Sequence, residues 1–75
     1  MNNIRRKQIK AIIERLNDEK SNLNFVLDDE QYAYDNMTEG LQSTEKGMNS
    51  EESIELLENA IECLEECIEN LVEIQ

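Results

Sequence analysis

The chain has 75 residues, of which 39% are hydrophobic and 33% are charged, and its formal net charge is −11. This length allows one domain at most and no deep enclosed core, which disfavours an active-site cleft. No histidine is present, which excludes histidine-based acid–base catalysis and histidine metal ligation. The negative charge disfavours direct DNA binding, because an acidic surface repels phosphates. No apolar run approaches about 18 residues, so we expect a cytoplasmic protein with no membrane partner.

Charge is distributed unevenly along the chain. Residues 1–20 carry six basic and three acidic groups, whereas residues 21–75 carry one basic and fifteen acidic groups. Such a division is typical either of internal charge complementarity or of a surface that meets two different partners.

The first predicted element is a helix over about residues 2–38. Apolar side chains recur at a seven-residue spacing, and others lie beside them: Ile9, Leu16, Leu23 and Met37, with Ile12, Ile13, Val26, Leu27, Ala33 and Tyr34. Glu19 and Glu30 interrupt this stripe. Weak helix formers between residues 17 and 24 leave a bend open as an alternative to a continuous helix.

The next element is a loop over about residues 39–50, because Gly40, Gly47 and a cluster of small polar residues fall there. A second helix is predicted over about residues 51–74, with Asn49 or Ser50 as its N-cap. Its apolar residues alternate at steps of three and four: Ile54, Leu57, Ile61, Leu64, Ile68 and Leu71. With Ile54 at heptad position a, every a is Ile and every d is Leu. Small residues at position g, namely Ser53, Ala60 and Cys67, allow a neighbouring helix to approach closely.

These elements predict an all-α fold, a single domain over residues 1–75 that forms an antiparallel, coiled-coil-like two-helix hairpin. The antiparallel direction brings the acidic second helix toward the basic start of the first. The predicted helices differ by about 13 residues, or about 20 Å, so one end of the first helix should overhang. The exposed isoleucines of this overhang would be Ile4, Ile9, Ile12 and Ile13. Phe25 and Tyr32 lie opposite the main stripe, so we predict a homodimer, a four-helix assembly or a higher helical oligomer.

Cys63 and Cys67 lie four residues apart on one helical face. They are weak candidates for zinc ligands, because no histidine is available and the spacing is not that of a two-residue zinc knuckle. Small reduced thiols that pack between helices are the favoured interpretation, and no metal or other cofactor is predicted.

The second helix also carries an array of carboxylates: Glu62, Glu65, Glu66, Glu69 and Glu73. Di-iron helical bundles require Glu-x-x-His motifs, which this chain lacks. The heptad pattern predicts that most of these glutamates form a solvated outer face. If the array has a function, imitation of a phosphate backbone that occupies the basic channel of another protein is favoured.

Arg5, Arg6, Lys7 and Lys10 form the one basic cluster. The favoured interpretation is pairing with acidic groups in the hairpin or the dimer. The alternative is a phosphorylated ligand, such as a nucleotide messenger, held between protomers. The residues of that site would be Arg5, Arg6 and Lys10, with base stacking on Tyr32 or Tyr34.

One segment shows a family pattern, E-x-x-A-x-D-N-M-x-E-x-L-Q followed by Ser and Glu. Its matching residues are Glu30, Ala33, Asp35, Asn36, Met37, Glu39, Leu41, Gln42, Ser43 and Glu45. This segment resembles a group of small helical proteins predicted from phages, prophages and mobile elements of Gram-positive bacteria. Thr38 stands where that group usually has proline. The resemblance implies a phage setting in a bacterial host cell but no activity, and Asp35-Asn36-Met37 is interpreted as a helix-ending motif with Leu41 folding back onto the hairpin.

No enzyme signature is present, since the chain lacks a phosphate-binding glycine loop and a nucleophile paired with histidine. The leading hypothesis is a non-enzymatic interaction protein. It would be an anti-defence factor, anti-CRISPR-like or a nucleic-acid mimic, that binds a host nuclease or other nucleic-acid-binding protein through its glutamates. One alternative is an oligomeric sponge that sequesters a nucleotide immune signal. Another is a structural or accessory phage protein.

Overall fold

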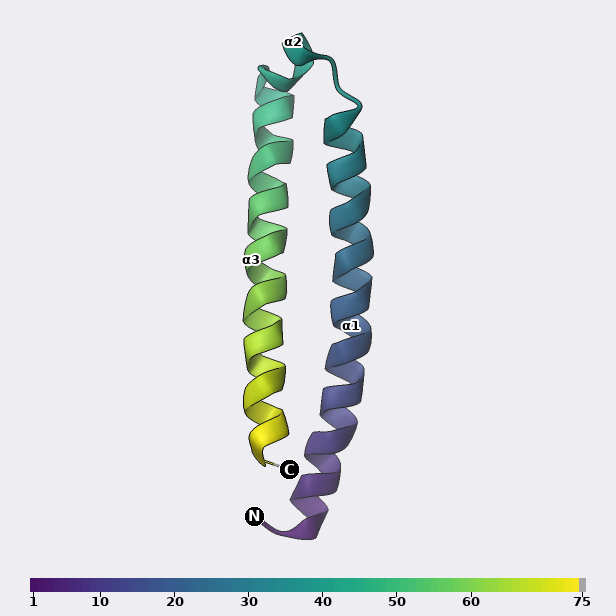
Figure 1. The fold of residues 1–75 in the computed structure, drawn as a ribbon, viewed down its shortest axis with the longest axis vertical. Coiled ribbons are helices and arrows are strands. Elements are labelled where there is room, and N and C mark those ends of the chain that lie inside the picture. The colour runs from purple at the N-terminus through teal and green to yellow at the C-terminus, as the bar shows by residue number, and fades with distance from the viewer. Residues whose placement is uncertain (75) are drawn as a thin grey trace.

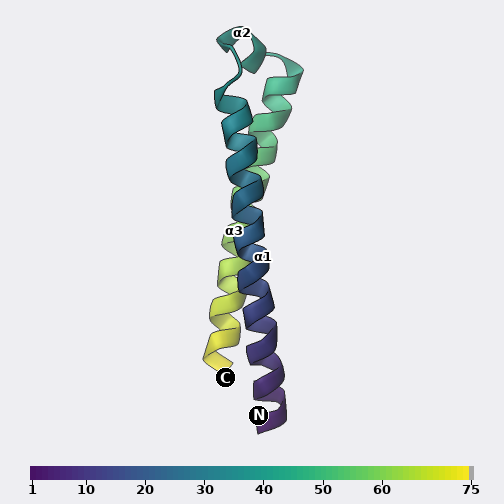
Figure 2. The same cartoon turned by 90° about the vertical axis from the view of Figure 1, so that its right-hand side faces the viewer.

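The computed structural model describes residues 1–74 as a helical hairpin (Figure 1). Its elements are α1 (Asn3–Asp35), α2 (Glu39–Gln42) and α3 (Glu45–Ile74). The two long helices run antiparallel and lie side by side in Figure 1, and α1 passes in front of α3 in the view turned by 90° (Figure 2). The Cα atoms span 58 × 15 × 13 Å, so the molecule is a rod. The predicted all-α hairpin is therefore confirmed, and no helix within residues 1–74 has the length and apolar character needed to span a membrane.

Helix α1 is continuous, and side chains of the chain itself cap both of its ends. The Asn2 Oδ1 atom accepts a hydrogen bond from the Arg5 backbone N–H at 2.8 Å, which satisfies one of the unpaired donors of the first turn. At the other end, the Asn36 side-chain amide donates to the Tyr32 carbonyl at 2.7 Å. The helix ends at Asp35, so the predicted helix-ending motif is confirmed.

The predicted loop over residues 39–50 is wrong for most of its length. Residues 39–42 form α2, whose N-cap Thr38 accepts a hydrogen bond from the Leu41 backbone N–H at 3.2 Å. Helix α3 begins at Glu45, six residues before the predicted start at residue 51. Asn49 and Ser50 therefore lie inside α3 and are not N-caps. Propensity favoured a cap at this Asn-Ser pair, but local hydrogen bonds at Thr38 and Thr44 let helices start earlier.

The corner between α2 and α3 requires a residue without a side chain. Gly47 is buried, and a Cβ atom placed on it would overlap the backbone of Gln42. Gly40 has open space around it, because an added Cβ would meet nothing within 4 Å beyond its chain neighbours and the backbone of its own helix. One glycine therefore permits the close approach of α2 to α3, whereas the other does not carry that constraint.

The early start of α3 also corrects the predicted overhang. Helices α1 and α3 contain 33 and 30 residues, so α3 reaches almost as far along the rod as α1. Ile13 is only 8% exposed and Ile9 is half-buried, whereas Ile4 in the first turn is 69% exposed. The predicted long apolar overhang is therefore wrong, and only the start of α1 extends beyond α3.

A single heptad seam holds the two long helices together. The seam residues of α3 are all buried or half-buried: Gly47, Ser50, Ile54, Leu57, Ile61, Leu64, Ile68 and Leu71. The facing residues of α1 and of the turn that follows it keep the same spacing: Ile9, Ile13, Leu16, Lys20, Leu23, Leu27, Glu30, Tyr34 and Met37. Only four apolar side chains fall below one-tenth exposure, namely Ile13, Ile54, Ile61 and Ile68. The core is one layer deep, and each such isoleucine contributes about 1.5–3 kcal/mol.

Candidate interaction surfaces

The outer side of α3 carries a continuous acidic surface, which we call the acidic face. It consists of exposed glutamates: Glu51, Glu52, Glu55, Glu58, Glu62, Glu65, Glu66, Glu69 and Glu73. With Ile54 at position a, six of them occupy heptad positions b and f, which point away from the a/d seam, and Glu51, Glu58 and Glu65 occupy position e, which flanks it. The prediction that the glutamates from Glu62 to Glu73 form a solvated outer face is therefore confirmed.

Four of these carboxylates surround a shallow hollow on α3. Glu62, Glu65, Glu66 and Glu69 line this space of about 360 Å³. No group of three or more potential metal ligands gathers in the part of the chain that the structure describes. Within residues 1–74 these carboxylates therefore line an open surface and do not form a carboxylate cage.

Most of the charge on the acidic face is uncompensated. Glu65 forms an ion pair with Lys20, with 3.6 Å between the Lys20 Nζ and the Glu65 Oε1 atoms. Both side chains remain partly exposed, and such pairs contribute about 0–1 kcal/mol. Within residues 1–74 this is the only ion pair. Of the other glutamates of the acidic face, Glu51 accepts a hydrogen bond from Tyr34, and none forms an ion pair within residues 1–74.

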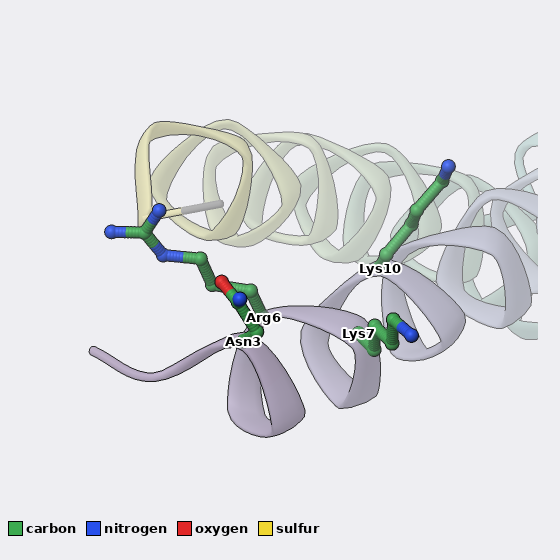
Figure 3. A pocket seen from close by; sticks show the side chains of 4 residues that line it. All are labelled: Asn3, Arg6, Lys7 and Lys10. Atoms are coloured by element: carbon green, nitrogen blue, oxygen red, sulfur yellow. The ribbon is translucent and has the colours of Figure 1, made fainter.

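The basic cluster lies at the opposite end of the rod from the loop. Asn3, Arg6, Lys7 and Lys10 line an open hollow of about 340 Å³ on α1 (Figure 3). The charged ends of Arg6, Lys7 and Lys10 point in different directions (Figure 3). None of these cations forms an ion pair within residues 1–74.

The structure does not bring the basic cluster and the tyrosines together within one chain. Lys10 and Tyr32 are separated by 22 residues of the continuous helix α1, which corresponds to about 33 Å. Tyr32 is 73% exposed on the back of α1, whereas Tyr34 lies in the seam. A nucleotide site that combines these residues would need contributions from two chains.

The loop end of the seam contains a polar cluster that the sequence analysis did not identify. The Ser50 hydroxyl donates to the Glu30 carboxylate at 2.5 Å, and the Tyr34 hydroxyl donates to Glu51 at 3.5 Å. The Gln42 side-chain amide donates to the Tyr34 carbonyl at 3.0 Å. Partial burial and the neighbouring Glu51 carboxylate together raise the pKa of the Tyr34 phenol. The Ile/Leu heptad, extended backward from Ile54, places Ser50 at a seam position. A small side chain with a hydroxyl at that position is the signal in the sequence for a polar contact with Glu30.

A second stripe runs along α3 beside the seam, and we call it the uncharged stripe. Its residues alternate at steps of three and four through heptad positions c and g: Asn49, Ser53, Leu56, Ala60, Cys63, Cys67, Asn70 and Ile74. All of them are exposed, and Leu56 is 60% exposed. The two cysteines are free thiols on this stripe. The predicted close approach of a helix to the small residues therefore does not occur within one chain.

Comparisons with known proteins add no family or fold relative. No family model matches the sequence, and no curated protein or solved structure shows significant similarity to it. The resemblance to phage-encoded proteins therefore stays a prediction.

Proposed function

We propose that this chain is a non-enzymatic interaction protein whose acidic face occupies the nucleic-acid-binding surface of a basic protein. The charge spacing on α3 carries the proposal. Nine glutamates fall between residues 51 and 73, a helical distance of about 33 Å, which gives one carboxylate per about 4 Å. One strand of B-DNA carries one phosphate charge per about 3.4 Å of axis. The acidic face therefore has nearly the linear charge density of a nucleic-acid strand.

The rod shape suits this role. A groove that accepts a nucleic-acid strand is long and narrow, and the hairpin measures 15 × 13 Å across its two short Cα axes. All nine glutamates are exposed along one side of α3, so a partner can reach them along one edge of the rod. Lysines and arginines that bind phosphates also bind carboxylates, because both are anionic acceptors.

The sequence resemblance suggests that the partner is a protein of a bacterial host. Residues 28–45 resemble small proteins predicted from phages and mobile elements of Gram-positive bacteria. A host nuclease, or another nucleic-acid-binding protein of a defence system, is a basic protein that a phage benefits from blocking. We therefore propose an anti-defence role. The nucleotide-sponge alternative has no supporting contact within one chain, because Arg5 and Arg6 lie far along α1 from Tyr32 and would meet it only in an assembly of two chains.

The test is capture of a host protein, followed by displacement of its nucleic acid. The immobilised chain is incubated with lysate of a Gram-positive host, and each retained protein is purified with labelled DNA or RNA bound. We expect the free chain to displace the nucleic acid, and we expect capture to weaken steeply with salt. A captured protein that holds the chain and its nucleic acid at the same time would overturn the proposal.

Matched charge variants assign the effect to one face. The variant Glu62→Gln/Glu66→Gln/Glu69→Gln removes three charges from the acidic face. The control Asp18→Asn/Asp28→Asn/Asp29→Asn removes three exposed charges from α1. We expect about a tenfold or greater loss of displacement for the first variant and a much smaller loss for the control. Equal losses would show that net charge alone, and not the acidic face, determines binding.

A further inference from the structure

The two sides of the α1–α3 seam differ in charge. On one side, position e of α3 carries Glu51, Glu58 and Glu65, and two of these contact α1 through Tyr34 and Lys20. On the other side lies the uncharged stripe, which has no acidic or basic residue between Asn49 and Ile74. A carboxylate-free surface on so acidic a helix is the place where another negatively charged molecule can approach α3 most closely.

Helix α1 adds apolar groups to this same side. In an antiparallel helix pair, the g positions of both helices flank the same side of the seam. The seam of α1 places Ile12, Val26 and Ala33 at position g, and the structure leaves Ile12 and Val26 38% and 51% exposed. Glu19 is the acidic residue at this position. The side therefore combines exposed apolar groups of α1 with small and apolar groups of α3.

The exposed area of the chain exceeds that of a compact monomer of its size. A folded monomer of 8.8 kDa exposes about 4,800 Å². The hairpin exposes 5813 Å², an excess of about 1,000 Å². A standard stable interface buries about 800 Å² on each partner. The excess area is therefore similar to the area that one chain buries in a standard interface. The core contains only four buried isoleucines, and small chains with such a core commonly gain stability by oligomerisation.

We infer that a second copy of this chain docks on the uncharged stripe and that the two hairpins form a four-helix bundle. The interface buries Leu56, Ala60, Cys63 and Cys67 against the partner copy. Small side chains at these positions permit close helix packing, and the outward-facing glutamates of both copies remain accessible. The basic cluster of each copy, unpaired within its own described chain, is available to the carboxylates of the other. This inference does not depend on the proposed binding partner.

Sedimentation equilibrium tests the inference with two neighbouring substitutions. Ala60→Arg places a charge on the uncharged stripe, whereas Asn59→Arg places the same charge on the adjacent outer surface. Both positions are exposed in the single chain, so circular dichroism should show helix content like that of the wild type. We expect a wild-type mass of twice 8.8 kDa. We also expect at least about a tenfold rise in the dimer dissociation constant for Ala60→Arg, and less than about a threefold change for Asn59→Arg.

Thiol labelling provides a second readout that does not depend on a variant folding. Cys63 and Cys67 are exposed in one chain but buried in the inferred dimer. We expect maleimide labelling of the wild type to slow by about tenfold or more as the protein concentration rises through the dissociation constant. The control is Asn59→Cys in a Cys63→Ser/Cys67→Ser background, which should label at one rate at every concentration. A monomeric wild type, equal effects of the two arginine substitutions, or unprotected cysteines in an oligomer would each overturn the inference.

Discussion

The two halves of the helical seam are built differently. Away from the loop, the seam consists of Ile and Leu from α3 packed against Ile13, Leu16 and Leu23 of α1, and its charged member, Lys20, pairs with Glu65 at the edge. Near the loop it contains Gly47, Ser50 and a hydrogen bond between Ser50 and Glu30. The apolar half supplies burial energy, which does not depend on direction. The polar half joins particular partners at particular positions, because its hydrogen bonds form only when the donor and the acceptor meet.

The largest expected effect comes from the apolar half. We expect Ile61→Ala to lower the free energy of unfolding by about 2–4 kcal/mol, because Ile61 is 7% exposed and its removal leaves a cavity. The control Val72→Ala, at a position 47% exposed, should change it by less than about 1 kcal/mol. Urea unfolding followed by circular dichroism, at one protein concentration, measures both. Equal losses would mean that the seam does not hold the hairpin.

An intermediate effect is expected at the loop end. We expect Gly47→Ala to destabilise the hairpin by about 1–3 kcal/mol, because the added Cβ overlaps the Gln42 backbone and forces α2 away from α3. Gly40→Ala is the matched control. It adds a methyl group where no atom lies within 4 Å, so it should be neutral or stabilise the helix by about 0.5–1 kcal/mol. The same urea titration distinguishes them, and a Gly47→Ala variant as stable as the wild type would refute the close α2–α3 contact.

The smallest effect concerns the ionisation of Tyr34. In a Tyr32→Phe background, where Tyr34 is the remaining tyrosine, absorbance titration should give a pKa above the ordinary value of 10.0. Partial burial and Glu51 cause this shift, so Glu51→Gln should lower the pKa toward 10.0. Because the pKa is raised by folding, the associated stability is complete below pH 10 and is lost as the pH rises through the raised pKa. If Glu51→Gln left the pKa of Tyr34 unchanged, the hydrogen bond between Tyr34 and Glu51 would be contradicted.

Much of the fold follows from residue spacing alone. The alternation from Ile54 to Leu71 predicts a helix with one buried face and an outer acidic face, and both predictions agree with the burial in the structure. The Asp35-Asn36-Met37 helix end also follows from local chemistry, because an Asn side chain readily bonds a nearby carbonyl. The predicted loop failed where a propensity for capping at Asn49 and Ser50 competed with the hydrogen bonds at Thr38 and Thr44.

The acidic surface could be predicted more completely than the contacts beneath it. Glu62 and Glu66 are placed outside by the helical period, which requires no knowledge of α1. The partner of Glu30 was not predicted, because Glu30 and Ser50 are twenty residues apart and meet only when α1 and α3 take one particular register. The short overhang of α1 was not predicted for the same reason, because its length depends on where α3 starts relative to α1.

The sequence by itself determined that two amphipathic helices would bury an isoleucine and leucine seam and expose their glutamates. The physical reason is local, because the 3.6-residue period of a helix assigns each side chain to a face before any tertiary contact forms. Only the tertiary structure decided the register, the Gly47 corner, the polar cluster around Tyr34, and the exposure of the uncharged stripe. These features depend on contacts between residues distant in the chain, which local spacing does not specify.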